Sequence, residues 1–109
     1  MSQAKGIYNE VEGIFPGGEY TTVECDRHAF ARTEHGRGNQ NDIYKLKLDG
    51  TGKNFKRLTH FNDYEGWYAN NPVISTDGRF MALSLARSMN ISAKTGLGYG
   101  IVLYWFTKE

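Results

Sequence analysis

The sequence predicts an all-β fold made of two similar antiparallel units. Aromatic and β-branched residues gather in short clusters, which is typical of strands. Turns rich in glycine, of which the chain has 13, separate these clusters. No segment keeps the apolar spacing of three and four residues that an amphipathic helix requires. A length of 109 residues suits one small domain rather than two independent ones.

An internal repeat organises the chain. Glu12–Arg27 aligns with Pro72–Arg87, and Asn41–Gly50 aligns with Tyr99–Lys108. In both units a strand, a tight glycine turn, a second strand, a long loop and a third strand follow one another. The two units are therefore predicted to share one topology.

The first unit is predicted to contain four strands and two tight turns. The turns are the segments PGG and DGTGK, in which glycine supplies the positive φ of a tight hairpin. The strands are expected at about Glu12–Phe15, Tyr20–Cys25, Asp42–Leu48 and Phe55–Leu58.

The second unit is predicted to contain three strands and to lack a fourth. The three strands are expected at Val73–Ser75, Phe80–Leu85 and Ile101–Phe106. Residues 1–8 are a candidate for the missing outer strand, because they include an unassigned segment of about strand length. The single domain 1–109 is thus divided into a first unit at 9–59 and a second at 60–109.

Two of the predicted strands, FMALSL at Phe80–Leu85 and IVLYWF at Ile101–Phe106, are apolar on both faces. This pattern suits strands that lie between neighbouring sheets, as in β-propeller blades stacked around an axis. The alternative is an ordinary antiparallel sandwich that uses the same hairpins.

The segments NPVISTDGRFMALSLAR, NDIYKLKLDGTG and KRLTH carry a more specific pattern. They resemble the blade motifs of the TolB-like β-propeller family. The resemblance implies two antiparallel β-propeller blades and covers most of Glu12–Phe106. The first unit departs from the motif, because Gly17 stands where an Asp that braces the turn is expected.

The segments EGIFPGGEYTTVECDRH and GYGIVLYWF also resemble the closing blades of large TolB-like proteins, some of them similar to oligogalacturonate lyases. The chain is then either a C-terminal piece of such a protein or a short chain that assembles its own ring. Two blades alone would leave large apolar faces exposed. We therefore expect a homo-oligomer, preferably a trimer that closes a six-bladed ring.

Long loops are predicted at one end of the molecule, because successive connections in a meander emerge at alternate ends. The loop at about His28–Gln40 offers cationic and amide groups that suit a carboxylate or a sugar acid. The loop at about His60–Asn71 offers aromatic faces beside carboxylates and amides, which suit a carbohydrate. The alternatives are a solvated loop and aromatic residues that cover the core. The candidate ligand-binding residues are His28, Arg32, His35, Asn41, His60, Asp63, Tyr64, Trp67, Tyr68 and Asn70.

No catalytic residue, metal site or cofactor is predicted. Asp63 and Glu65 are carboxylates in one loop with no group that would shift either pKa, so two solvated carboxylates are the favoured interpretation. His28 and His35 lack a recognised metal-ligand spacing. Cys25 is the only cysteine, which excludes a disulfide within the chain.

The charge balance narrows the expected partners. Thirteen basic and 12 acidic residues give a net charge of +1, so no overall field favours nucleic acid or an anionic membrane. No apolar run is long enough for a signal peptide or for insertion into a membrane. The compartment stays open, and a periplasmic parent protein is compatible with the resemblance.

Three classes of function follow. The first is a ligand-binding or protein-docking module, with carbohydrate as the leading ligand and the long-loop face as the site. The second is a C-terminal fragment of a TolB-like enzyme, either a polysaccharide lyase or a peptidase propeller. The third is a purely structural repeat. We expect the chain by itself to be a binding module rather than an enzyme.

Overall fold

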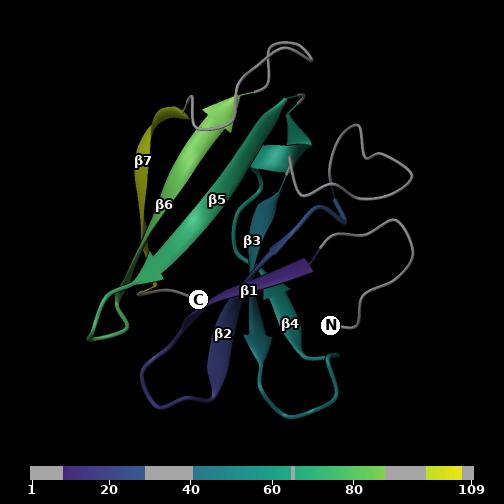
Figure 1. Ribbon diagram of the computed structural model, residues 1–109, viewed down its shortest axis with the longest axis vertical. Coiled ribbons are helices and arrows are strands. Elements are labelled where there is room, and N and C mark those ends of the chain that lie inside the picture. Colours follow the sequence, from purple (N-terminus) through teal and green to yellow (C-terminus); the bar gives the residue numbers. More distant parts are fainter. Residues whose placement is uncertain (1–8, 29–40, 65, 88–97, 107–109) are drawn as a thin grey trace.

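The computed structural model describes residues 9–28, 41–64, 66–87 and 98–106, which form two antiparallel sheets (Figure 1). The prediction of an all-β fold is confirmed. The first sheet contains β1 (Asn9–Ile14), β2 (Tyr20–Cys25), β3 (Asp42–Lys47) and β4 (Phe55–Arg57). The second contains β5 (Trp67–Ile74), β6 (Phe80–Arg87) and β7 (Gly98–Trp105). A 3-10 turn, η1 (Phe61–Asp63), precedes β5.

In both sheets every strand pairs with the strand that follows it in the chain. Most strand positions agree with the sequence prediction: β2 has the predicted bounds, and β3 and β4 each end one residue early. Strand β1 begins at Asn9 rather than Glu12. Among the described residues no helix has the length and apolar character needed to cross a membrane.

The start of strand β5 differs from the sequence prediction. The sequence predicts a strand only at Val73–Ser75, but β5 begins at Trp67, inside the expected loop His60–Asn71. The first residues of β5 pair with the last residues of β6, and the register then shifts at a bulge where Asn71 has a φ of 54°. A bulge interrupts the alternation of side chains along a strand. The first half of β5 therefore has the sequence pattern of a loop.

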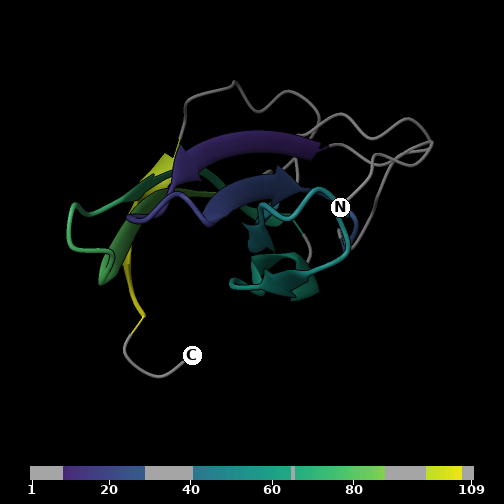
Figure 2. The same ribbon diagram turned by 90° about the horizontal axis from the view of Figure 1, so that it is seen from below.

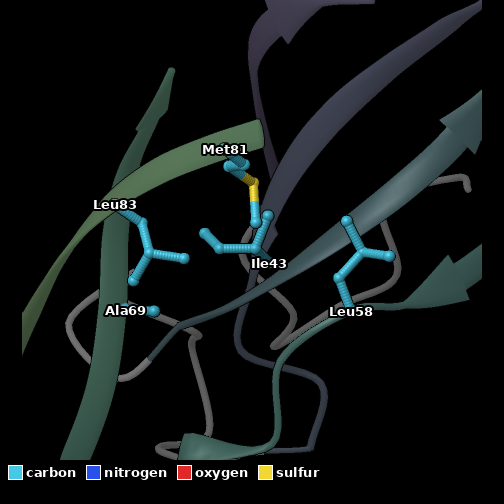
Figure 3. Packing of buried hydrophobic residues seen from close by; sticks show 5 residues of the cluster. All are labelled: Ile43, Leu58, Ala69, Met81 and Leu83. Atoms are coloured by element: carbon cyan, nitrogen blue, oxygen red, sulfur yellow. The ribbon is translucent and has the colours of Figure 1, made fainter. Parts of the chain in front are cut away.

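The two sheets pack against each other through one buried apolar cluster, in which Ile43 of β3 and Met81 of β6 point toward each other (Figure 3). The cluster consists of Ile43, Leu58, Ala69, Met81 and Leu83. Burial of a large apolar side chain contributes about 1.5–3 kcal/mol. Figure 2 shows the sheets side by side, with β6 and β7 on one side and β2, β3 and β4 on the other.

Strand β7 is apolar on both faces, but the described part of the chain covers only one of them. Val102 and Tyr104 pack against the buried cluster. Ile101, Leu103 and Trp105 alternate with them and are 74%, 65% and 60% exposed. The second sheet therefore carries an exposed apolar outer face.

The short turns lie together at the lower end of Figure 1, and η1 lies toward the opposite end. In the β5–β6 turn, Asp77 Oδ1 accepts hydrogen bonds from the Ser75 hydroxyl at 2.7 Å and from the Arg79 N–H at 3.0 Å. The β1–β2 turn has Gly17 in the position of Asp77 and forms with a φ of 92° at that glycine. This turn thus uses the conformational freedom of glycine in place of an Asp brace.

Candidate functional site

Asp42, the first residue of β3, is the centre of a buried hydrogen-bond network near η1. Its carboxylate accepts hydrogen bonds from the Thr59 hydroxyl at 2.6 Å and from Arg57 Nη2 at 2.7 Å. The backbone N–H groups of Phe61 and Asn62 donate to the same carboxylate over 2.9 and 3.1 Å. The Asp42 side chain has no exposed surface. The network therefore fastens the segment from β4 to η1 onto β3.

A second network joins Asn41 to β5. Asn62 Nδ2 donates to the backbone carbonyl groups of Trp67 and Asn41, over 2.9 and 3.3 Å. The Ala69 N–H donates to the Asn41 carbonyl at 2.7 Å. The side-chain amide of Asn70 lies 3.1 Å from that of Asn41. The structure thus places two of the predicted ligand-binding residues, Asn41 and Asn70, in a link between the sheets.

Three other predicted residues meet at the surface of η1. The side chains of His60 and Asp63 are 60% and 54% exposed, and Tyr64 is 67% exposed. Asp63 Oδ1 accepts a hydrogen bond from Arg57 Nη2 at 3.0 Å, and His60 Nδ1 lies 3.8 Å from Asp63 Oδ2. Arg57 therefore connects the exposed Asp63 to the buried Asp42. We call His60, Asp63 and Tyr64 the η1 surface.

Trp67 and Tyr68 lie in β5 rather than in a loop, and both are half-buried. The guanidinium group of Arg87 lies over the Trp67 ring, 5.3 Å from its centroid. Arg27, which occupies the equivalent repeat position, lies 4.8 Å from the centroid of Phe55. Both arginines thus make cation–π contacts that cover part of an aromatic ring.

His28 lies directly after β2 and contacts Tyr44. The two rings stack with their centroids 5.7 Å apart, and His28 Nδ1 is hydrogen-bonded to the Tyr44 hydroxyl. Burial, together with the positive charges of Arg57 and Arg27, lowers the pKa of His28. Burial raises the pKa of Tyr44. Both side chains are therefore neutral near pH 7.

Two of the predicted site residues, Arg32 and His35, lie outside the described residues. Glu65, which the sequence analysis weighed as a partner of Asp63, also lies outside them. The described part of the predicted site therefore consists of the η1 surface, the Asn41–Asn70 link, the β5 aromatic residues and His28.

Sequence reasoning missed a cluster of three carboxyl groups. The carboxylate oxygens of Glu10, Glu12 and Glu24 lie within 4.8 Å of one another. Burial, then a hydrogen bond to Glu12, then the negative charges of Glu12 and Glu10 raise the pKa of Glu24 to about 8. The Asn71 N–H donates to Glu24 Oε1 at 2.9 Å and opposes this shift. The raised pKa thus leaves the Glu24 carboxyl largely protonated at neutral pH.

The sequence did contain a signal for the Asp42 network. Asp42 begins the segment DIY, and Arg57 and Thr59 belong to RLT, so the network joins polar residues of two motifs already identified. Glu24 had no such signal. It stands in β2 between Val23 and Cys25, and its contact with the Asn71 N–H depends on how β5 packs against it.

No family model, curated protein or solved structure matches the chain. The fold and the described site define an all-β protein of two antiparallel sheets with an exposed polar and aromatic surface at one end. The resemblance to TolB-like blades stays a hypothesis that depends on the three motifs.

Proposed function

We propose that the chain is a ligand-binding or protein-docking module whose site includes the η1 surface, with carbohydrate as the first ligand class. The observation that carries this proposal is the placement of exposed His60, Asp63 and Tyr64 on a segment that the Asp42 network holds in place. Binding groups are most effective when a rigid scaffold fixes their positions, because less entropy is lost on binding.

The chemistry of the η1 surface suits a sugar. An exposed tyrosine ring offers an apolar face for the C–H groups of a pyranose, and its hydroxyl offers a hydrogen bond. Asp63 adds acceptors and His60 adds an imidazole that donates or accepts. Asp63 is held by Arg57, which gives its carboxylate a fixed direction.

The η1 proposal predicts that Tyr64→Ala weakens binding of a glycan identified on a glycan array. We expect a loss of affinity of about tenfold, because an aromatic contact contributes about 0.5–1.5 kcal/mol beyond the apolar area that it buries. Titration calorimetry with the identified glycan measures this loss. Leu48→Ala, an exposed apolar residue at the short-turn end, is the control and should bind normally. Unchanged affinity in Tyr64→Ala would exclude the η1 surface.

We also propose that the two sheets are TolB-like propeller blades and that three chains close a six-bladed ring. The support is the outer face of the second sheet, where Val73, Ile101, Leu103 and Trp105 are each at least 60% exposed. Exposed apolar faces of this kind are normally covered by a partner. In a propeller the partner is the next blade, supplied here by another copy.

The assembly proposal predicts a mass near three chains of 12.4 kDa in light scattering coupled to size exclusion. Leu103→Lys should reduce that mass, because it places a charge in the proposed interface. Leu48→Lys, which adds the same charge at a turn, should keep the mass of the unmodified chain. A stable monomer of the unmodified chain would contradict the argument from the exposed face.

A further inference from the structure

A groove with a volume of about 370 Å³ lies on the first sheet, near the short turns. Its lining comes from β2, from the end of β3 and from the start of β4. The lining residues are Tyr20, Lys45, Lys47, Asn54, Phe55 and Lys56. Small-molecule sites have volumes of about 300–1,000 Å³. The groove contains none of the residues predicted from the sequence and is separate from the η1 surface.

The sheet register gathers three lysines at this groove. Lys45 of β3 is directly opposite Lys56 of β4, and Lys47 follows two residues later on the same face of β3. Like charges that face each other across two strands destabilise a sheet. Among the described residues neither Lys47 nor Lys56 forms a salt bridge. A bound anion would attract the Lys47 and Lys56 ammonium groups.

Aromatic rings fix one of these ammonium groups. Lys45 Nζ lies 4.6 Å from the ring centroid of Tyr20 and 4.7 Å from that of Phe15. Phe106 adds a third ring at 5.8 Å. Contacts of this kind hold a cation in position. The Lys45 ammonium group is therefore positioned before any ligand arrives.

The turn beside the groove is also braced. The Asp49 carboxylate accepts hydrogen bonds from the Thr51 N–H at 3.0 Å, from the Thr51 hydroxyl at 2.7 Å and from the Asn54 amide. These bonds, with those from Thr51 the largest cause, lower the pKa of Asp49 to about 2. They hold Asn54 at the groove, where its amide can contact a polar ligand atom.

We propose that this groove binds a phosphate monoester whose organic part lies against Tyr20. The lining contains three lysines and no acidic residue, and lysine binds phosphate as a compact point charge. A phosphate monoester carries close to two negative charges at neutral pH, which suits a site with three lysines. This proposal is independent of ligand binding at the η1 surface.

The test uses adenosine 5′-monophosphate, adenosine and inorganic phosphate as probes of the full chain. Amide chemical-shift mapping should place saturable changes from adenosine 5′-monophosphate at Tyr20, Lys45, Lys47 and Lys56. We expect adenosine to bind about tenfold more weakly, because it lacks the charge-assisted hydrogen bonds. Inorganic phosphate should bind more weakly as well, because it lacks the ring. Added salt should weaken binding of the monophosphate.

Paired variants decide the role of the lysines. The paired variant, which carries both Lys47→Gln and Lys56→Gln, should bind the monophosphate about tenfold more weakly. The control variant is Lys53→Gln, at an exposed lysine in the same hairpin, and its affinity should change by less than about twofold. Lys47 and Lys56 are exposed, and a cooperative thermal melt at a temperature no lower than that of the unmodified chain verifies the fold. Three results would overturn the proposal: equal losses in the paired and control variants, shifts centred outside the groove, or no saturable binding at millimolar monophosphate.

Discussion

Replacing Asp42 with alanine should lower the free energy of unfolding by about 3–5 kcal/mol, a large part of the stability of a domain of this size. The change removes a buried acceptor and leaves Thr59, Arg57 and the N–H groups at the start of η1 without their partner. Urea denaturation followed by circular dichroism measures the loss.

Two further variants sharpen this prediction. Asp42→Asn keeps the size of the side chain and part of its acceptor capacity, so it should fall between the unmodified chain and Asp42→Ala. Asp77→Ala is the matched control, since Asp77 also braces a backbone turn but is exposed. A loss in Asp42→Ala no greater than that in Asp77→Ala would show that the buried network contributes little.

Stability should fall as the pH rises from about 4.5 to about 8, because Glu24 keeps its proton in the folded chain and releases it in the unfolded chain over that range. Its folded pKa is raised, so the stabilising contribution is complete below 4.5 and is lost as the pH approaches 8. The slope from this one group is at most about 1.4 kcal/mol per pH unit. Urea denaturation at a series of pH values measures it.

Glu24→Gln removes the ionisable group while its amide oxygen can still accept from the Asn71 N–H. The variant should flatten the slope between pH 4.5 and 8 and should be more stable than the unmodified chain at pH 8. Glu19→Gln, at an exposed position in the β1–β2 turn, should keep the original slope. Equal slopes in the unmodified chain and in Glu24→Gln would contradict the raised pKa of Glu24.

The sequence predicted the strands well where tight glycine turns delimit them. Gly17 and Gly78 lie in the tight turns that join the two strands of a hairpin, and β2 has the predicted bounds. The sequence-based prediction failed at β5, because the bulge at Asn71 breaks the alternation of side chains that identifies a strand.

The candidate site was less predictable than the fold. His60, Asp63 and Tyr64 lie together at the surface, as neighbouring residues of one loop must. Asn41 and Asn70 are 29 residues apart, and their contact depends on how β5 docks on β3, which residue type alone does not indicate. The lysine groove arises from strand register, and register is set by pairing rather than by any single motif.

The strand order has a consequence for folding kinetics. Every strand pairs with its neighbour in the chain, so each sheet can form by closing successive hairpins, at a small cost in loop entropy. Docking of the sheets is different, because Ile43 must meet Met81 and Leu83 from distant parts of the sequence. We therefore expect the rate-limiting barrier to lie at docking, so that Met81→Ala should slow folding measured by stopped-flow fluorescence.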